Sequence, residues 1–287
     1  MNTKNYNSLL EDLKNQEHYM EDENEKTIYD EKRKVEALFD RKLVCPVCDS
    51  NITVRSVKSS SIRILSRDSD FMIHYKEPNP MFYDVWVCPQ CGYAAISAQF
   101  NNINDKQIKL IREKICSKWH PRTYPPVYDI DIAIERYKLA LLSSIVKDGK
   151  ISERALLCLK LAWLNRIKKD EKNEKKFMSQ ALKGFIKSYE SEIFPIAGLD
   201  EPSLTYLIGE LYRRLDDNTN ALIWFGRVLS NTSAKNSIKD LAREQKYIIY
   251  EQRKNLAEHI EEADDRDSSD KKGFWKKLFN ISKQSNA

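Results

Sequence analysis

Four of the six cysteines occupy two C-P-x-C motifs, a spacing at which thiols commonly bind metal. Cys45 and Cys48 form the first motif, and Cys88 and Cys91 form the second. Two thiolates on one tight turn can both reach an ion at about 2.3 Å, and two such turns complete a tetrahedral shell. In a reducing compartment this pattern indicates a metal site in preference to two disulfides. The sequence therefore predicts one metal centre with four cysteine ligands.

The residues that flank these cysteines favour tight turns. Pro46 and Pro89 fix φ directly after the first ligand of each motif. The residue after the second ligand often needs a left-handed conformation, which Gly92 adopts easily and Asp49 tolerates. Turns of this kind direct backbone N–H groups at the sulfurs, and those groups stabilise the thiolates.

Zinc is the predicted metal, and iron is the alternative because a four-sulfur shell can hold either ion. Four thiolates leave no coordination position for water, so we expect a structural centre and not a catalytic one. A thioredoxin-like redox site would need one C-x-x-C in a βαβ frame, which the sequence lacks. Cys116 and Cys158 lie in helical apolar patterns and are predicted to be buried side chains. His74 could compete as a ligand, but a surface histidine is favoured.

The 39 residues between the motifs have the pattern of β structure. Apolar and polar residues alternate at 52–57 and 61–65, and an aromatic, β-branched run at 81–87 leads into the second motif. The loop 67–80 between them is polar. We expect a zinc-ribbon-like metal module over 41–101, preceded by an acidic helical or disordered segment over 1–40.

From about residue 104 the apolar period becomes that of amphipathic helices. Gly209, Ala221 and Phe225 have the spacing of a tetratricopeptide repeat, and Ala133 and Tyr137 match half of one. The predicted fold class is α+β and mostly α, with the β module followed by an irregular tetratricopeptide-like array over 102–256. A charged linker and a basic amphipathic tail follow over 257–287. The expected helices lie at 131–142, 152–168, 172–192, 202–215, 219–230 and 235–256.

The composition excludes several function classes. The formal net charge is +5, and 41% hydrophobic with 32% charged residues is typical of a soluble globular protein. Only seven glycines are present, which disfavours phosphate-cradling enzymes because their turns need glycine at fixed offsets. The sequence has no P-loop, dinucleotide-binding, hydrolase or zinc-protease motif. Without a secretory signal pattern or a long apolar run, a cytoplasmic location is expected.

The helical body is basic overall, so an acidic peptide is a plausible partner for a groove in the array. Arg166, Arg213 and Arg214 are the candidate contacts. A solvated helix face explains these arginines equally well, and both interpretations stay open.

The carboxyl end has the composition of a short interfacial helix. An acidic stretch at 261–267 precedes an aromatic and lysine-rich segment, in which apolar burial would add to attraction between lysine and anionic lipid. Peripheral contact with the inner face of the membrane is therefore one interpretation of this segment, and a frayed tail or a docked helix is the other. The candidate contact residues are Phe274, Trp275, Lys276, Lys277, Leu278 and Phe279.

Several further motifs accompany the two C-P-x-C turns: the runs 67–71, 87–94 and 162–166, Asn79-Pro80 and Tyr83. Together these motifs resemble one bacterial family, the domain of unknown function 2225, over roughly residues 42–232. The resemblance implies a zinc-ribbon-like module joined to tetratricopeptide-like helices, and it implies no established activity. Asp49 departs from the glycine usual in this position.

The sequence features support three hypotheses of function. The first is a non-enzymatic adaptor whose helices bind a protein or peptide. The second is nucleic-acid binding by the ribbon through basic strand residues with aromatic neighbours, against which stands the balanced charge of 45–91. The residues of this second hypothesis are Arg55, Lys58, Arg63, Arg67, Phe82, Tyr83 and Trp86.

The third hypothesis is an enzyme that uses the polar loop. Asp68, Asp70, His74 and Tyr75 could supply acid–base groups or bind a second metal. We favour a structural interpretation, in which the aspartates cap turns and pair with arginines.

Overall fold

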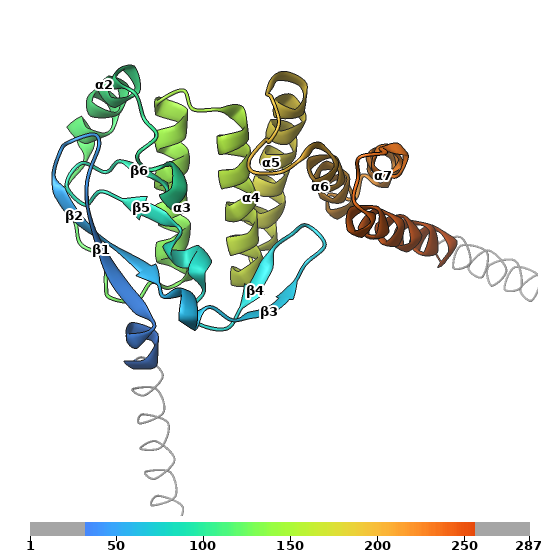
Figure 1. Cartoon of the computed structure of the whole chain (residues 1–287), viewed down its shortest axis with the longest axis horizontal. Helices are drawn as coiled ribbons and strands as arrows, with labels where there is room; N and C mark the ends of the chain where they lie inside the picture. The colour runs from blue at the N-terminus through green and yellow to red at the C-terminus, as the bar shows by residue number, and fades with distance from the viewer. Residues whose placement is uncertain (1–31, 256–287) are drawn as a thin grey trace, which may run out of the picture. The chain divides into compact units, whose positions relative to one another are not determined.

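The computed structural model describes residues 32–255, which fall into two compact units, 32–197 and 198–255 (Figure 1). The first unit contains every strand in this described part of the chain, and the second is helical. The fold class is therefore α+β and mostly α, as predicted. The first unit includes the whole predicted metal module and also the helical residues up to 197.

Short strands of the first unit form three separate antiparallel pairs. The pairs are β1 (Leu38–Val44) with β2 (Asn51–Val57), β3 (Ile64–Arg67) with β4 (Ile73–Tyr75), and β5 (Val85–Val87) with β6 (Ala94–Ile96). The first cysteine motif lies in the turn between β1 and β2, and the second lies in the turn between β5 and β6. Each motif thus closes a hairpin of its own.

The strand predictions are confirmed in part. Strand β2 matches the predicted 52–57, whereas β3 begins only at Ile64. The predicted strand 81–87 is wrong in its first half, which forms a 3₁₀ turn over Pro80–Tyr83. That turn begins there because the side chain of Asn79 accepts a hydrogen bond from the backbone N–H of Met81 at 3.0 Å.

Strand β1 is not among the predicted strands, because its sequence shows no clear alternation. It begins at Leu38, inside the segment 1–40 that is predicted to be helical or disordered, so that prediction is wrong for its last three residues. Residues 1–31 of the segment lie outside the described part of the chain. Of the seven residues of β1 only Leu38 is buried, and the centre of the strand is charged and exposed. Pairing along its whole length with β2, from Leu38 opposite Val57 to Val44 opposite Asn51, forms the strand in spite of this pattern.

The helices of the first unit confirm those predicted between residues 131 and 192. Asn104, Asp129 and Asp170 precede three of them, and each side chain accepts a backbone N–H from the first turn. These caps fix where each helix begins. The helices are α2 (Asp105–Lys114), α3 (Ile130–Val146), α4 (Ile151–Lys168) and α5 (Glu171–Ser191).

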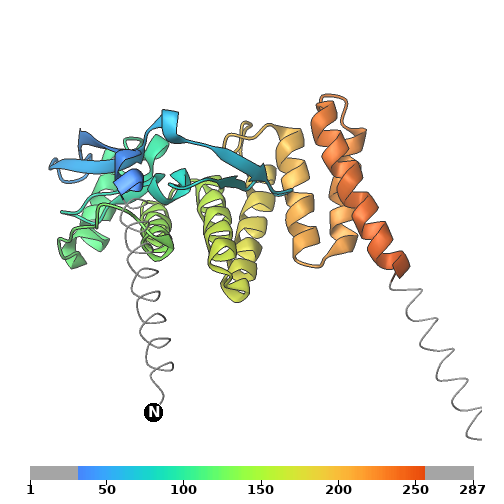
Figure 2. The same ribbon diagram turned by 90° about the horizontal axis from the view of Figure 1, so that it is seen from below.

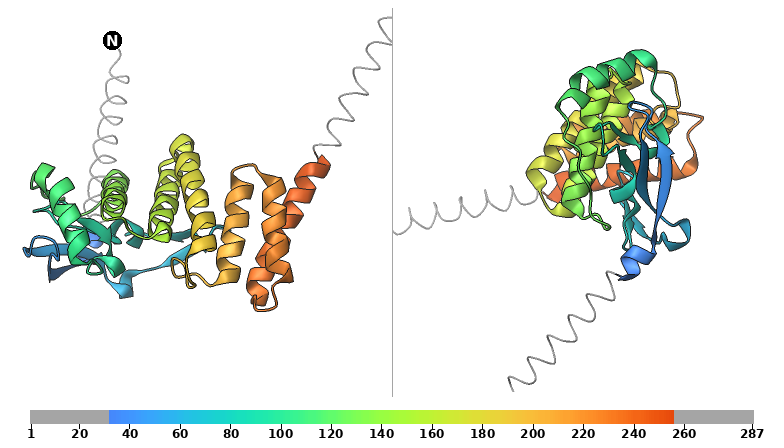
Figure 3. Two further views of the ribbon diagram at one scale, coloured as in Figure 1. Left: turned by 90° about the horizontal axis from the view of Figure 1, so that it is seen from above. Right: turned by 90° about the vertical axis from the view of Figure 1, so that its left-hand side faces the viewer.

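Figure 2 and Figure 3 show α3, α4 and α5 side by side, with the β hairpins on one side of them. Helix α3 contacts both β5 and β6, and the hydroxyl of Ser143 accepts a hydrogen bond from the backbone N–H of Ala94 at 3.2 Å. Helix α2 adds Ile111 to the core around the cysteines, where it joins Tyr93 and Phe100. Helices and cysteine hairpins therefore share one core in this unit.

The second unit consists of α6 (Glu201–Arg214), α7 (Asn218–Ser230) and further helical residues at 236–255. These confirm the helices predicted there. Helices α6 and α7 pack closely because Gly209 has no side chain: a Cβ at this position would lie 2.9 Å from the ring of Phe225. Within residues 32–255, no helix combines the length and the apolar character that crossing a bilayer requires.

Candidate metal centre

The structure brings the four motif cysteines together. The Sγ atoms of Cys45 and Cys91 are 3.7 Å apart, those of Cys48 and Cys88 are 3.6 Å apart, and all four lie within 4.8 Å of one another. Sulfurs on a tetrahedral ion with bonds of about 2.3 Å would be about 3.8 Å apart. The four thiols therefore fit the shell of a single metal ion.

The two cysteine turns have the same backbone geometry. In the first, the carbonyl of Cys45 accepts the N–H of Asp49 at 2.9 Å, and in the second the carbonyl of Cys88 accepts the N–H of Gly92 at 2.9 Å. Asp49 and Gly92 have φ of 60° and 77°. The predicted left-handed residue after the second cysteine is thus confirmed in both turns.

Each turn is anchored at the end of its hairpin. The backbone N–H of Cys45 donates to the carbonyl of Ser50 at 2.9 Å, and that of Cys88 donates to the carbonyl of Tyr93 at 2.8 Å. The strands thereby fix the direction of both thiol pairs. Cys45, Cys88 and Cys91 are buried, and Cys48 is half-buried.

Trp119 covers the second turn. Its indole Nε1 donates a hydrogen bond to the carbonyl of Pro89 at 2.9 Å, and its ring lies against Gly92. A Cβ at Gly92 would come within 2.5 Å of the ring carbons. Trp119 has no sequence signal that links it to the cysteines, because the contact spans residues far apart in the chain.

The side chain of Arg112 in α2 contacts the first cysteine turn and stabilises it. Its Nε donates to the carbonyl of Val47 at 2.5 Å, and its Nη2 lies 3.4 Å from the carboxylate of Asp49. This contact also joins distant residues, and sequence reasoning missed it. Helix α2 and Trp119 thus hold the two cysteine turns from outside the hairpins.

The thiols of Cys45 and Cys88 influence each other's ionisation. Interactions with the neighbouring thiols of Cys45 and Cys91 hold the pKa of Cys88 well below its usual value. The pKa of Cys45 is raised, chiefly through its interaction with Cys88, although the backbone N–H groups of Val47 and Cys48 favour its thiolate. A cation that binds all four sulfurs must therefore displace protons from the cluster.

The other candidate ligands lie outside this group. Cys158 is buried as predicted, and its thiol lies 3.7 Å from the side-chain oxygen of Gln180. Cys116 is only half-buried, contrary to the prediction, and packs against the apolar residues around the cluster. His74 is hydrogen-bonded to Asp68 at 2.8 Å. Among the residues that the structure describes, the four motif cysteines form the one His, Cys, Asp or Glu cluster able to hold a metal ion.

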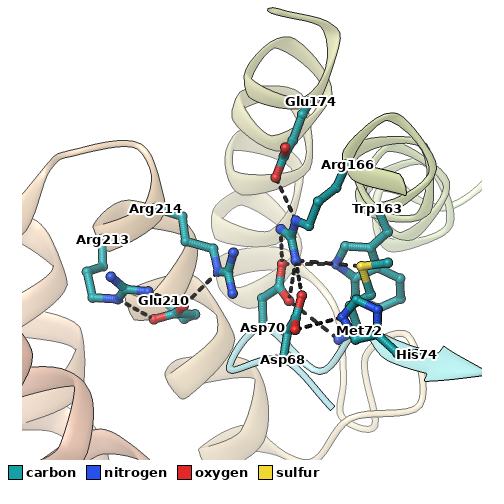
Figure 4. Close-up of polar contacts among 10 residues, drawn as sticks. All are labelled: Asp68, Asp70, Met72, His74, Trp163, Arg166, Glu174, Glu210, Arg213 and Arg214. Atoms are coloured by element: carbon teal, nitrogen blue, oxygen red, sulfur yellow. Dashed lines mark hydrogen bonds and ion pairs between the residues drawn. The ribbon is translucent and has the colours of Figure 1, made fainter. Parts of the chain in front are cut away.

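Arg166 of α4 lies in a cluster of carboxylates (Figure 4). Its guanidinium is 2.7 Å from Asp68, 2.6 Å from Asp70 and 2.7 Å from Glu174. Asp70 is fully buried and also accepts the indole N–H of Trp163 at 3.0 Å. The interpretation of these aspartates as arginine partners is confirmed. Binding of an external peptide by Arg166 stays a prediction, and the guanidinium already has three internal partners.

Arg213 and Arg214 share one carboxylate within α6. They lie 2.7 Å and 2.8 Å from the same oxygen of Glu210, whose side chain is fully buried (Figure 4). Their proposed contact with a partner also stays a prediction.

The aromatic side chains of the nucleic-acid hypothesis are not all accessible. Tyr83 is 4% exposed and stacks on Tyr128, with ring centroids 4.7 Å apart. Arg55 is held by Asp40 at 2.8 Å. A base therefore cannot stack on Tyr83 in this conformation. The predicted membrane contacts at 274–279 lie outside the described residues.

Comparison with known proteins gives one family. A family model described as an uncharacterized protein conserved in bacteria, DUF2225, matches residues 38–249. No curated protein and no solved structure matches the chain.

Proposed function

The chain belongs to the DUF2225 family of uncharacterised bacterial proteins, and we propose that it is a non-enzymatic adaptor whose four motif cysteines bind one structural Zn²⁺. The observation that carries the metal assignment is the convergence of four sulfurs from two turns, with paired distances of 3.6 and 3.7 Å. Thiolates would fill the tetrahedral shell, which leaves no position for a water nucleophile. Iron is the other ion that such a shell can hold.

The role of the ion would be to join two hairpins. Cys45 and Cys48 come from the β1–β2 hairpin, and Cys88 and Cys91 come from the β5–β6 hairpin. These hairpins belong to different two-stranded sheets, so no ladder of backbone hydrogen bonds links them. Binding of an ion would therefore contribute directly to the folding free energy of this part of the first unit.

The adaptor role is supported by the helical surface of the second unit. Ile223, Tyr247 and Tyr250 are 51%, 64% and 52% exposed. Tyrosine is enriched in protein interfaces because it combines a large apolar ring with a polar end. The close approach of α6 and α7 at Gly209 supports a tetratricopeptide-like arrangement, which is a common scaffold for binding peptides.

Metal analysis of the full-length protein, purified from its native cells without chelators, tests the first part. We expect about one equivalent of zinc per chain, lost in a Cys48→Ser, Cys91→Ser double variant. A Cys158→Ala variant is the matched control, because it removes a thiol outside the cluster and should keep the metal. Less than about half an equivalent of zinc plus iron in the wild type would overturn the metal site.

Cross-linked affinity purification tests the adaptor role. The full-length protein is compared with a Tyr247→Asp, Tyr250→Asp variant, in which both changed side chains are exposed. An Ile193→Asp variant is the control, because Ile193 is 93% exposed but lies in the first unit. We expect discrete proteins that the control retains and the tyrosine variant loses. Equal recovery with both variants would contradict a partner site on these helices.

A further inference from the structure

A buried arginine without a carboxylate partner lies in α3. Arg136 is 2% exposed, and its Nη2 donates a hydrogen bond to the carbonyl of Val85 at 2.5 Å. Its guanidinium carbon is 4.8 Å from the ring centroid of Tyr124 and 4.3 Å from that of Tyr128. Because burial raises the pKa of Tyr124 to about 12, that ring is neutral near pH 7. One peptide oxygen and the side chains of Tyr124 and Tyr128 are therefore the immediate partners of this charge.

Nearby carboxylates are bound to other cations. Glu135 forms an ion pair with Arg122 and accepts the hydroxyl of Tyr124 at 3.0 Å. Arg136 takes part in none of the ion pairs of residues 32–255, and its buried Nε has no hydrogen-bond partner among them. Burial of a charge without a counter-ion costs free energy. A negatively charged group bound beside Arg136 would therefore be stabilising.

A comparison with Arg166 shows the effect of the carboxylate partners that Arg136 does not have. Both arginines are buried, and burial disfavours the charge on each. In Arg166 the hydrogen bonds and charges of Asp70 and Glu174 outweigh burial and raise its pKa above the usual value. In Arg136 burial prevails and lowers the pKa. The difference between them is that carboxylates pair directly with Arg166, whereas none among residues 32–255 pairs with Arg136.

Arg136 forms part of the wall of a pocket of about 280 Å³ in the first unit. The charged residues of the wall are Arg136, Arg55 and Asp40, so one positive charge is not balanced. Arg55 and Asp40 pair with each other, which assigns the unbalanced charge to Arg136. The apolar part of the wall includes Tyr124, Pro125, Pro126 and Tyr128.

We propose that this pocket binds a carboxylate carried on a flat or apolar group, with Arg136 as the charged anchor. A single unbalanced positive charge matches a monoanion better than a phosphate monoester, which carries about −1.5 to −2 near pH 7. The tyrosine and proline side chains provide an apolar surface for the rest of the ligand. The carboxylate can belong to a free acid or to the end of a peptide. This site uses none of the four motif cysteines and is independent of the proposed adaptor role.

Fluorine NMR titration of the full-length protein with para-fluorobenzoate tests the proposal, with para-fluorobenzamide as the neutral probe of the same shape. We expect saturable binding of the acid only. An Arg136→Met variant should bind the acid at least about tenfold more weakly, because a charge-assisted hydrogen bond is lost. An Arg243→Gln variant should bind it normally, because this arginine is 60% exposed and lies in the second unit.

A second variant raises affinity, so its result does not depend on a loss of folding. Asp40→Asn removes the negative charge from the pocket wall at a side chain that is 49% exposed. Binding of the acid should tighten by about twofold or more, the range of exposed charge interactions. A short peptide ending in phenylalanine, as free acid and as amide, then separates the two sources of the carboxylate. Binding of the peptide acid tighter than that of para-fluorobenzoate assigns a chain end, and weaker binding assigns a free acid.

Three results would contradict the proposal that this pocket binds a carboxylate. The first is equal binding of para-fluorobenzoate and para-fluorobenzamide. The second is unchanged binding of the acid to both the Arg136→Met and the Asp40→Asn variants. The third is no saturable binding of the acid or of the peptide to the wild type.

Discussion

The ring of Trp119 lies where the side chain of any residue other than glycine at position 92 would be. A Cβ at Gly92 would approach the indole carbons to 2.5 Å, and the backbone there has φ of 77°. The second cysteine turn is therefore restricted to glycine for two independent reasons, one conformational and one steric.

Replacement Gly92→Ala should lower the free energy of unfolding by more than about 2 kcal/mol, because a left-handed penalty of about 1 to 2 kcal/mol adds to the displacement of Trp119. The zinc affinity of the full-length protein should fall with it, as measured by competition with a chelator. Gly198→Ala is the matched control, because Gly198 has φ of 81° and no atom within 4 Å of the added Cβ. Equal losses in the two variants would show that Trp119 has no steric role.

Removal of Arg166 should destabilise the first unit strongly. Arg166→Met leaves Asp68, Asp70 and Glu174 without their shared cation, and Asp70 is fully buried. We expect a loss of about 3 to 5 kcal/mol in the free energy of unfolding, measured with urea. Arg243→Met, which breaks an exposed pair with Asp240, should cost less than about 1 kcal/mol. A loss no larger than in this control would contradict a stabilising role for the cluster.

Stability should depend on pH through Asp68. Burial opposes its ionisation, but hydrogen bonds from His74 and Arg166 outweigh burial and hold the pKa of Asp68 below its usual 3.8. The ionised carboxylate therefore stabilises the folded state above pH 3.8, and this contribution is lost as the pH falls through the lower, folded-state pKa. The wild type should be more stable than Asp68→Asn near neutral pH, and the difference should shrink in acid. Urea unfolding over this pH range measures it, and a constant difference would contradict the ionic contribution.

Removal of the metal should expose the motif thiols to modification. With metal bound, a thiol reagent should react slowly with Cys45, Cys48, Cys88 and Cys91, and after chelation all four should react. Mass spectrometry of the modified full-length chain counts these sites. Cys158 is the internal control, because it lies outside the cluster and its reactivity should not change on chelation. Modification of the four thiols at the same rate before and after chelation would argue against a bound ion.

The basic carboxyl end is expected to bind anionic vesicles. The full chain should sediment with vesicles that contain phosphatidylserine, whereas a chain that ends at Asp270 lacks the aromatic and lysine residues of 271–279 and should stay in the supernatant. Neutral vesicles are the control, and they should retain less of the full chain. Equal sedimentation of the two chains with anionic vesicles would contradict a membrane contact through this tail.

Local patterns predicted the cysteine turns and the helices well. The second cysteine turn is an example, in the five residues Cys88-Pro89-Gln90-Cys91-Gly92. The ligand spacing, the fixed φ of proline and the left-handed glycine all lie within these residues, so the geometry of the turn could be predicted from sequence. The helices from 131 to 230 are equally local, because their apolar period and their capping residues agree.

Contacts between distant residues could not be predicted in this way. The sequence leaves Arg166 either as a peptide contact or on a solvated helix face. Two of its three partners, Asp68 and Asp70, lie almost a hundred positions earlier in the chain. Arg136 occupies an ordinary position of an amphipathic helix, and only its packing against Tyr124 and Tyr128 shows a buried charge. Strand β1 forms through pairing with β2 and not through its own alternation.

The chain between the two cysteine turns is held at its ends by the thiol cluster and near its middle by the contacts of Asp68 and Asp70 with α4. These contacts divide one long loop into two shorter loops, each held at both ends. The entropy of closing a loop grows only with the logarithm of its length, by about 0.6 kcal/mol for each doubling. Insertions or deletions in the exposed stretches between the thiol cluster and the contacts of Asp68 and Asp70 would therefore change the stability of the fold little. They would also leave the sulfurs in place.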